Sequence, residues 1–466
     1  MPRSSIIATI GPASCSPDVI KGIALAGSKI FRLNFSHGHH DFHKECASNI
    51  REVERSTGIS LSILMDLQGP KLRIGCFSDG KVSLTTGARF ILDLCPDAGN
   101  STRVPFPHPE IFDSLLDGTP IFLDDGKIKL SVLNNDGNSI ETEILEGGIL
   151  SNKKGVNIPS IVLPISALTE KDVSDLAIVN DITADWIAVS FVQSADDVIR
   201  ARSLIGPDFG IVAKIEKPVA IDNIDSILEV SDAVMVARGD LGVEIPFESI
   251  PAAQMVITKR ALYHKKPVIV ATQMLESMIH CHVPTRAEVT DVAFAVGCGA
   301  DAVMLSAETA SGEHPVDTVE TMRKITLQSE KSNLHFIEAD DSHLTAMAKT
   351  VKTAVETACI PFVFVFTESG KTAIEISNSR LNSKIIALTP NPKTVHKLHL
   401  AWGVTAFVID EIFSFSQLIQ IAQDISCKHF GAANGDNIAI VSGMPFRLSG
   451  AINILHIFEI KSNPEQ

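Results

Sequence analysis

The chain has 466 residues, about three times the usual size of a single domain, so we expect two or three domains, each with its own core. Hydrophobic residues make up 45% of the sequence, yet no apolar run approaches the roughly 18 residues that cross a bilayer. The formal net charge of −15 argues against broad nucleic-acid or membrane-surface binding, because counterion release needs clustered Lys and Arg. Small anionic substrates stay compatible with this charge if basic residues converge locally.

The N-terminal residues, MPRSSIIATIGP, contain one Arg and then a strand-like run that is too short for a signal-peptide core. Eight cysteines are scattered without paired spacing, as expected for reduced thiols. We therefore expect a soluble, cytoplasmic protein. His280, Cys281 and His282 are consecutive, but neighbouring residues of one segment point in different directions and no second ligand pair lies nearby in the sequence. A metal site is not expected there.

Short β-branched runs alternate with longer amphipathic helices through the first and middle thirds of the chain, a pattern typical of parallel βα units. Eight strands are predicted, at residues 5–10, 28–33, 61–66, 185–190, 210–215, 232–237, 267–271 and 301–305. Eight is the number of strands that closes a TIM (β/α)8 barrel.

The segment between the third and fourth strands, residues 68–163, has a different pattern. Helical periodicity is weak, and alternating runs at 81–84 and 127–132 are accompanied by Asp-Gly turn signals at 79–80, 125–126 and 136–137. We predict a small β-barrel domain inserted in a loop of the TIM barrel. Because active sites lie at the C-terminal face of such barrels, this domain is placed to act as a lid.

A polar stretch at 332–342 predicts a linker, and strand and helix patterns alternate again after it. Helices are predicted at 343–359, 369–380, 392–400 and 415–429, and strands at 362–366, 384–388, 405–409, 437–441 and 452–460. This is the pattern of an open-sheet α/β domain. The expected division is therefore 1–67 and 164–337 for the barrel, 68–163 for the insertion and 338–466 for the C-terminal domain.

Most of the predicted barrel strands end in residues that bind metal or phosphate. Lys214 and Glu216 are two apart and therefore share one side of a strand, and Asp240 follows the next strand. Two carboxylates and water suit Mg²⁺, and a nearby Lys suits a transferring phosphoryl group. An ordinary ion-pair network is the alternative for any single residue, but the convergent set favours a phosphoryl-transfer site. The other members of the set are Arg32, Asn34, Ser36, Asp66 and Thr272.

Two further motifs do not carry their usual function. Residues 369–372, Ser-Gly-Lys-Thr, match the end of a P-loop, but the first glycine of that motif would fall at Val365. Gly297, Gly299 and Ala302 fit a degenerate dinucleotide fingerprint, but they follow a helix and precede a strand, the reverse of the required context.

Nine motifs, in this order, give the sequence a resemblance to the pyruvate kinase family over nearly its full length. They are ATIGPAS (8–14), FRLNFSHG (31–38), DLQGPKLRIG (66–75), KKGVNIP (153–159), AKIEKP (213–218), ARGDLGVEIP (237–246), ATQMLESM (271–278), PTRAE (284–288) and MLSAETASGEHP (304–315). The resemblance implies transfer of the phosphoryl group of phosphoenolpyruvate to ADP, giving pyruvate and ATP in the last step of glycolysis.

The resemblance also implies roles for matching residues. Glu216 and Asp240 would hold Mg²⁺, or Mn²⁺ in its place, and the backbone at Gly239 would bind the substrate carboxylate. Lys214 would neutralise the phosphoryl group in transfer, and Thr272 would assist protonation of the enolate. The residues expected to contact the phosphates of substrate or nucleotide are Arg32, Asn34, His37, Arg73 and Lys154.

A second, monovalent cation is bound in many members of this family. The matching positions here are Asn34, Ser36, Asp66 and the carbonyl of Leu67. Those members carry Glu where this chain has Lys71, so we hypothesise that the Lys71 ammonium replaces K⁺. The alternative is that Lys71 is a solvated surface residue and K⁺ still activates.

The C-terminal domain resembles the regulatory domain of the family. Its strand-to-helix loop would bind a phosphorylated sugar or a nucleotide effector; the alternative is a plain helix cap built from Ser369 and Thr372. The loop residues are Thr367, Ser369, Gly370, Lys371 and Thr372. The resemblance further implies a homotetramer. Phe294 stands where relatives commonly have Asn, and either packing or a subunit contact would account for it.

Two other functions are weighed against this one. A barrel lyase or aldolase acting on pyruvate or phosphoenolpyruvate would also place Glu and Asp on Mg²⁺, but it has no need of the inserted domain, Arg73 or Lys154. A catalytically idle phosphometabolite sensor has no need of Lys214 and Thr272.

Overall fold

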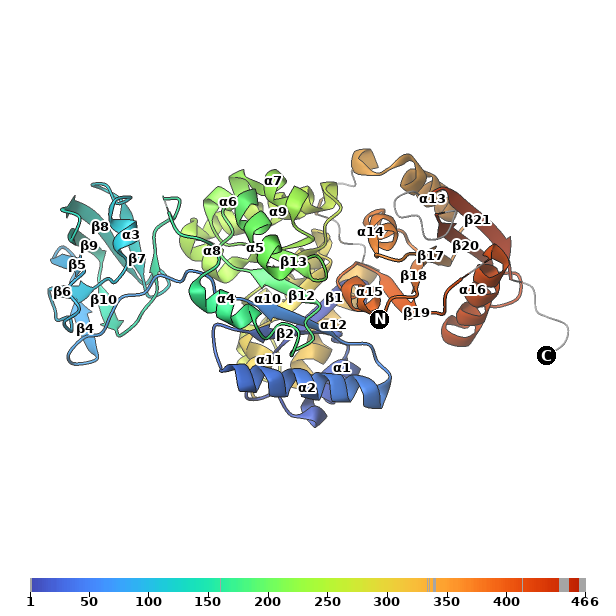
Figure 1. Ribbon diagram of the computed structural model, residues 1–466, viewed down its shortest axis with the longest axis horizontal. Helices are drawn as coiled ribbons and strands as arrows, with labels where there is room; N and C mark the ends of the chain where they lie inside the picture. Colours follow the sequence, from blue (N-terminus) through green and yellow to red (C-terminus); the bar gives the residue numbers. More distant parts are fainter. Residues whose placement is uncertain are drawn as a thin grey trace.

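The structure is a computed structural model that describes residues 2–159, 161–332, 334, 336–337, 341–412, 414–443 and 452–460. Along the long axis of Figure 1 the inserted segment lies at one end, the barrel in the middle and the C-terminal sheet at the other end. The polar stretch expected as a linker lies partly outside the described residues. Among the helices of the described residues, none is long and apolar enough to span a membrane.

Eight parallel strands close into a barrel, and all eight were predicted from the sequence. Their ends differ from the predicted ends by at most two residues. The order around the barrel is β1-β16-β15-β14-β13-β12-β3-β2. The strands are β1 (Ser5–Ile10), β2 (Ile30–Asn34), β3 (Ser62–Asp66), β12 (Trp186–Val189), β13 (Gly210–Ile215), β14 (Ala233–Ala237), β15 (Val268–Ala271) and β16 (Ala302–Leu305).

The barrel strands are short, β-branched and buried on both faces, as parallel strands covered by helices must be. Helices follow the strands and form the outer layer (Figure 1). They are α1 (Pro17–Ala26), α2 (His40–Thr57), α4 (Glu170–Leu176), α5 (Ala195–Ile205), α6 (Pro218–Asp222), α7 (Ile224–Val230), α8 (Arg238–Glu244), α9 (Ile250–Tyr263), α10 (Arg286–Gly297), α11 (Ala307–Ala310) and α12 (Pro315–Lys331), with 3₁₀ turns η1 (Phe247–Ser249) and η2 (Glu276–Ile279).

The insertion is built almost entirely of antiparallel strands around a core of its own. Its sheets have the orders β11-β7-β8-β9-β5-β6 and β10-β4. The elements are β4 (Lys81–Leu84), β5 (Arg89–Asp93), β6 (Arg103–Pro105), α3 (Pro109–Phe112), β7 (Pro120–Leu123), β8 (Ile128–Asn135), β9 (Ser139–Glu146), β10 (Gly148–Ser151) and β11 (Val156–Asn157).

A buried ion pair ties the insertion to the barrel where the chain returns. Lys217 Nζ lies 3.1 Å from Glu244 Oε2, and both side chains are almost fully buried. Lys217 also donates to the carbonyl of Ile158 at 3.2 Å, and the Asn157 amide donates to Glu244 Oε1 at 2.9 Å. This contact holds the end of the insertion against α8, the helix whose first turn contains the predicted metal ligand Asp240.

The C-terminal sheet has the order β19-β18-β17-β20-β21, parallel except for the antiparallel pair β20 and β21. Helices pack on both of its faces, as the alternating pattern predicted. The elements are η3 (Asp341–His343), α13 (Ala346–Thr357), β17 (Phe362–Phe366), α14 (Lys371–Asn378), β18 (Lys384–Thr389), α15 (Pro392–Leu398), β19 (Val404–Val408), α16 (Phe415–Phe430), β20 (Asn437–Ser442) and β21 (Ile454–Glu459).

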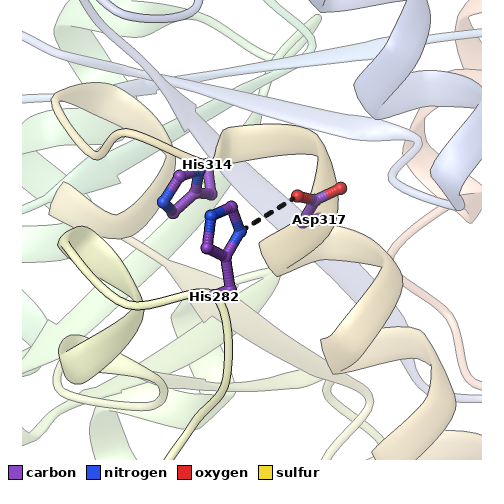
Figure 2. A group of neighbouring side chains, drawn as sticks. All are labelled: His282, His314 and Asp317. Atoms are coloured by element: carbon purple, nitrogen blue, oxygen red, sulfur yellow. Dashed lines mark ion pairs between the residues drawn. The ribbon is translucent and has the colours of Figure 1, made fainter.

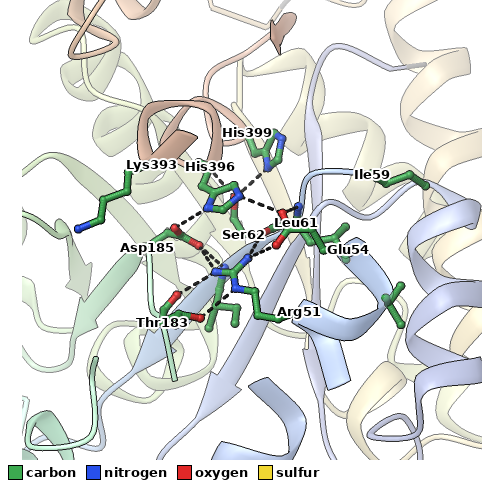
Figure 3. Close-up of polar contacts among 12 residues, drawn as sticks. Arg51, Glu54, Ile59, Leu61, Ser62, Thr183, Asp185, Lys393, His396 and His399 are labelled. Atoms are coloured by element: carbon green, nitrogen blue, oxygen red, sulfur yellow. Dashed lines mark hydrogen bonds and ion pairs between the residues drawn. The ribbon is translucent and has the colours of Figure 1, made fainter. Parts of the chain in front are cut away.

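Helix α15 docks on the N-terminal end of the barrel through His396 (Figure 3). Its imidazole lies 2.9 Å from Asp185 Oδ1 and 2.9 Å from Glu54 Oε1. Burial by itself lowers the pKa of His396, but the bonds to Asp185 and Glu54 raise it to about 9. Arg51 reaches the same two carboxylates, at 3.0 Å and 2.8 Å. The two cations, Arg51 and His396, are therefore each paired with both anions, Glu54 and Asp185.

Candidate active site

Lys214 is buried at the centre of a charged cluster at the C-terminal end of the barrel. Its Nζ lies 3.1 Å from Asp66 Oδ1 and 3.0 Å from Glu216 Oε1. It also donates to Ser190 Oγ at 2.6 Å. Burial by itself lowers the pKa of Lys214, but Asp66 and Glu216 raise it well above its usual value. The Lys214 ammonium is therefore charged and held in one position among the C-terminal ends of the barrel strands.

Arg32 supplies a second fixed cation. Its Nε donates to Asp66 Oδ2 at 2.6 Å, and its Nη1 donates to Thr9 Oγ1 at 3.2 Å. Burial opposes ionisation of Asp66, but Lys214 and Arg32 together hold its pKa below the usual value. Asp66 thus serves as the shared counterion that orients both cations.

Glu216 is fully buried, and its two oxygens differ. Oε2 accepts the backbone N–H of Phe191 at 2.7 Å. Oε1 forms the ion pair with Lys214 but accepts no hydrogen bond of good geometry from the part of the chain that the structure describes. Burial raises the pKa of Glu216, Lys214 opposes this, and the carboxylate of Asp240 raises the pKa further. Two carboxylates that repel each other are the arrangement that a divalent cation stabilises.

Asp240 lies in the first turn of α8, and the Lys71 ammonium faces it at 3.6 Å. Both side chains are about one-third exposed, so this ion pair is open to solvent. A cavity of about 400 Å³ opens beside Lys71, and its wall includes His108 from the insertion and Lys171 from α4. The predicted metal site is therefore next to a space bounded by both barrel and insertion.

Thr272 lies at the end of β15 with a left-handed backbone, φ 69°, and Gln273 follows with φ 53°. Such backbone strain in residues other than glycine concentrates at functional sites. The Thr272 hydroxyl accepts the backbone N–H of Gly239 at 2.7 Å, and Arg238 donates to the Thr272 carbonyl at 2.8 Å. These bonds place Thr272 against the first turn of α8, beside Asp240.

The residues predicted to contact phosphates are spread over the barrel and the insertion. Arg73 is exposed and donates to the carbonyl of Lys153 at 2.9 Å. Lys154 is paired with Asp124 at 2.7 Å, within the insertion. His37 is exposed, and its carbonyl lies 2.9 Å from His43 Nε2. The contacts of Arg73 and Lys154 stay within the insertion, as expected for groups on a lid.

Three of the four predicted monovalent-cation ligands, Asn34, Asp66 and the Leu67 carbonyl, have protein partners. The Asn34 side-chain oxygen accepts the N–H of Ser36 at 3.1 Å, and the Leu67 carbonyl accepts the hydroxyl of Ser190 at 2.7 Å. Asp66 is held by Arg32 and Lys214, whereas Lys71 contacts Asp240.

Comparison with known proteins assigns this geometry to a family. Residues 1–319 match the family model for the pyruvate kinase barrel domain, and residues 345–458 match the model for its alpha/beta domain. The chain is 44% identical to a pyruvate kinase of Agrobacterium vitis, over 98% of this chain and 97% of that protein. The chain belongs to the pyruvate kinase family.

Other relatives agree with this assignment. A pyruvate kinase of Methylorubrum extorquens is 43% identical over 98% of this chain and 97% of its own length. The crystal structure of a pyruvate kinase from Cryptosporidium parvum superposes with a TM-score of 0.91 at 32% identity, covering 98% of this chain and 96% of that one. As an enzyme of the pyruvate kinase family, the chain is a phosphotransferase of glycolysis, and its substrates are phosphoenolpyruvate and ADP.

Two groups of this site were missed in the sequence, Ser190 and Phe191, which bind Lys214 and Glu216. The signal for Ser190 was available, since it ends a predicted strand as Asp66 does. The Phe191 contact depends on two segments that the sequence does not pair. Arg238, one of the polar residues that follow the sixth predicted strand, fixes the Thr272 loop and is held in turn by Asp291 of α10 at 2.6 Å.

The loop that resembles the family's effector site has Gly370 as the residue before α14. Its φ is +86°, a conformation that favours glycine, and among the described residues no side chain caps this helix. Gly370 N–H donates to Thr367 Oγ1 at 3.0 Å. The alternative cap built from Ser369 and Thr372 is therefore wrong.

Phe294 stands where relatives commonly have Asn, and its ring packs against the Phe336 ring of the same chain, with the ring centroids 5.2 Å apart.

Proposed function

We propose that the chain transfers the phosphoryl group of phosphoenolpyruvate to ADP in a Mg²⁺-dependent reaction in which Lys214 neutralises the group in transfer. The observation that carries this is Glu216 Oε1, a buried carboxylate oxygen that faces Lys214 and accepts no well-formed hydrogen bond from the described residues. Lys214 pairs with this oxygen but leaves it without a well-formed hydrogen bond, and a buried polar atom in that state is costly unless a ligand or a further cation completes it.

Glu216 and Asp240 fit a hard divalent ion, because both offer carboxylate oxygens and repel each other without one. When bound, Mg²⁺ would neutralise charge on the substrate phosphate and carboxylate. The protein supplies the rest by position. Arg32 and Lys214 present cations held by Asp66, and transfer in line between two oxygens needs such fixed charges more than covalent chemistry.

Thr272 and Gly239 act on the pyruvate half of the substrate in this proposal. The Thr272 hydroxyl is within hydrogen-bond distance of Gly239 N, so the same turn can bind a carboxylate at its backbone and deliver a proton, through water, to the enolate. Arg73, Lys154, His37 and Asn34 bind the nucleotide phosphates when the insertion approaches the barrel.

The test is pyruvate release from phosphoenolpyruvate, measured with and without ADP and Mg²⁺, for the wild type and Lys214→Met. Release that requires both ADP and Mg²⁺ and that the substitution lowers by about 10²–10³-fold supports the proposal. Release without ADP would indicate a lyase or phosphatase instead, and unchanged activity in Lys214→Met would remove that residue from the mechanism.

We further propose that the enzyme works without K⁺ through Lys71. The support is that the Lys71 ammonium lies 3.6 Å from Asp240, so it adds beside the proposed divalent-metal site the positive charge that K⁺ would bring from its own, separate set of ligands. Initial rates in buffer free of Na⁺ and K⁺ test this. A rate within twofold of that in KCl is expected, and a negligible rate that KCl restores would contradict it.

The loop at 367–372 is proposed to bind a phosphorylated effector. Its support is the glycine-led start of α14, with Lys371 exposed next to it. Thr394 of α15 donates to the carbonyl of Glu368, so this loop contacts the helix that carries His396. Fructose 1,6-bisphosphate, ribose 5-phosphate, glucose 6-phosphate and AMP would be tested for a shift in the phosphoenolpyruvate curve. If none of the four compounds shifts this curve, effector binding at the loop is rejected.

We also propose a homotetramer, which light scattering tests.

A further inference from the structure

Two histidines and an aspartate meet on the barrel surface, outside the residues assigned to catalysis. His282 lies in the loop after η2, His314 immediately precedes α12, and Asp317 is in the first turn of α12. One potential ligand atom from each lies within 4.8 Å of the others. The two imidazole rings stack with centroids 3.6 Å apart, and His282 Nδ1 lies 3.8 Å from Asp317 Oδ2 (Figure 2).

This arrangement bears on the sequence-based expectation for His280-Cys281-His282, which found no second pair of potential ligands nearby in the sequence. The second pair of ligands is absent from the neighbouring sequence but is supplied by His314 and Asp317, about thirty residues further along the chain. His280 points to a different partner, since its Nδ1 lies 3.0 Å from Glu313 Oε1.

The loop that carries His282 is fixed at both ends. The Glu288 carboxylate accepts the N–H and hydroxyl of Ser277 at 2.7 and 2.6 Å, and the N–H and hydroxyl of Thr285 at 2.7 and 2.9 Å. One carboxylate therefore closes the segment between them. A ligand held on such a loop loses little backbone freedom when it binds a metal.

The segment that carries His314 is held against the same loop. Glu313 N–H donates to the carbonyl of Ile279 at 2.8 Å. Gly312 permits this approach, because a Cβ there would come within 2.4 Å of the Glu308 carbonyl and 3.3 Å of Ile279 Cα. The backbones that present the imidazoles are thus in direct contact before any ion binds.

An ion pair is a weak explanation for this convergence. His282 and Asp317 are 3.8 Å apart and their side chains are 73% and 60% exposed, so their attraction is screened. By contrast, a zinc ion with bonds of about 2.0–2.2 Å holds neighbouring ligands about 3–4 Å apart, which exposed side chains reach by small rotations.

We propose that His282, His314 and Asp317 bind one divalent transition-metal ion, with Zn²⁺ as the representative, at a site separate from Glu216 and Asp240. Two imidazoles and one carboxylate suit Zn²⁺, Ni²⁺ or Co²⁺, whereas Mg²⁺ prefers oxygen ligands. The bound ion joins the segment that follows Thr272 to the start of α12, and its remaining positions hold water.

The test is calorimetric titration of the full-length enzyme with Zn²⁺ in millimolar Mg²⁺, which keeps the oxygen-ligand site occupied. One equivalent is expected to bind to the wild type and to Glu216→Gln. The affinity for that equivalent falls by about tenfold or more in His282→Ala and in His314→Ala. Zn²⁺ also raises the midpoint of thermal unfolding of the wild type but not of His314→Ala.

His280→Ala is the matched control, because His280 is equally exposed, at 77% of its side chain, and pairs with Glu313 instead. Its affinity stays that of the wild type. Cys281→Ser gives the second control, and Co²⁺ bound to the wild type shows no thiolate charge-transfer band. Loss of binding in either control, or equal Zn²⁺ affinity of the wild type and His314→Ala, overturns the proposed ligand set. Retained phosphotransferase activity shows that the His280, Cys281, His282 and His314 variants are folded, and a cooperative thermal unfolding transition shows this for Glu216→Gln.

Discussion

Both ends of the barrel carry a network of charged side chains, and the two networks differ in how their cations and carboxylates are matched. At the N-terminal end, Arg51 and protonated His396 face Glu54 and Asp185, two cations against two anions. At the C-terminal end, Arg32 and Lys214 face a larger set of carboxylates, with Lys71 beyond them at the solvent edge. That set is Asp66, Glu216 and Asp240.

This difference separates stability from function. The carboxylates at both ends have cationic partners, but at the N-terminal end the bonds to His396 and to Leu61 N–H lower the pKa of Glu54 to about 2 although burial opposes this. At the C-terminal end the pKa of Glu216 is raised by burial and by Asp240. A network that stabilises the fold is complete without ligand, whereas a network that binds one is left incomplete.

The largest expected effect comes from exchanging one carboxylate at each end, the buried Glu216 and the partly buried Glu54. Glu216→Gln lowers kcat/KM by about 10²–10³-fold and raises the Mg²⁺ concentration needed, because it removes a metal ligand. Since the raised pKa marks a charge that the Mg²⁺-free fold tolerates poorly, the same change raises the unfolding midpoint of that form. Initial rates against Mg²⁺ and thermal unfolding measure the two effects.

Glu54→Gln is the matched control and gives the opposite result. Its stability falls because His396 and Arg51 lose one of the two anions that they share, while kcat/KM stays within about twofold of the wild type, as expected for a residue outside the site. If both variants lost activity equally, the separation between the two ends would be wrong.

The next effect is a pH dependence of stability set by His396. Its pKa rises from 6.5 to about 9 on folding, which corresponds to about 3 kcal/mol. A raised pKa stabilises the fold fully below the unfolded-state value, near pH 6.5, and this contribution is lost as the pH rises through about 9. His396→Gln therefore loses most stability near pH 6 and little above pH 9. Chemical denaturation at both pH values tests this, and a loss independent of pH would contradict it.

The catalytic end could be predicted from the sequence because its residues come from strand ends. Lys214 lies in β13 and Glu216 directly follows that strand, and parallel strands bring their carboxyl ends together whatever else the fold does. The eight barrel strands were equally accessible, since each is a short apolar run bounded by polar residues.

The remaining contacts depend on packing that no local pattern encodes. His396 meets Glu54 across 342 positions of sequence, and His314 meets His282 where Glu313 N–H bonds the carbonyl of Ile279. The Cys15 and Cys46 thiols, far apart in a set with no paired spacing, are in contact inside the barrel domain, and burial raises the pKa of both. Long-range contacts of this kind follow from the fold and cannot precede it.

A smaller effect is expected at the solvent edge of the catalytic end. Lys71→Glu replaces the cation beside Asp240 with an anion, so the variant should require added K⁺ for full activity, with a rate about tenfold lower without it. Rates of the wild type and the variant are compared across KCl concentrations. Lys71→Arg, which keeps the charge, is the control and stays independent of K⁺. A variant that KCl does not rescue would show that Lys71 acts otherwise.

The smallest effect is expected within a single strand. Strand β3 begins at Ser62, in the network at the N-terminal end of the barrel, and ends at Asp66, in the network at the C-terminal end. Ser62 Oγ donates to the carbonyl of His396 at 2.6 Å and lies 2.8 Å from His399 Nδ1. Ser62→Ala removes these contacts and costs about 1 kcal/mol of unfolding free energy, with kcat and KM unchanged, because nothing at the strand's far end is altered. Asp66→Asn, four residues on, releases Arg32 and Lys214 and lowers kcat. If Ser62→Ala also lowered kcat, the two ends of the barrel would be coupled through the strand itself, and the division between a structural and a catalytic network would have to be abandoned.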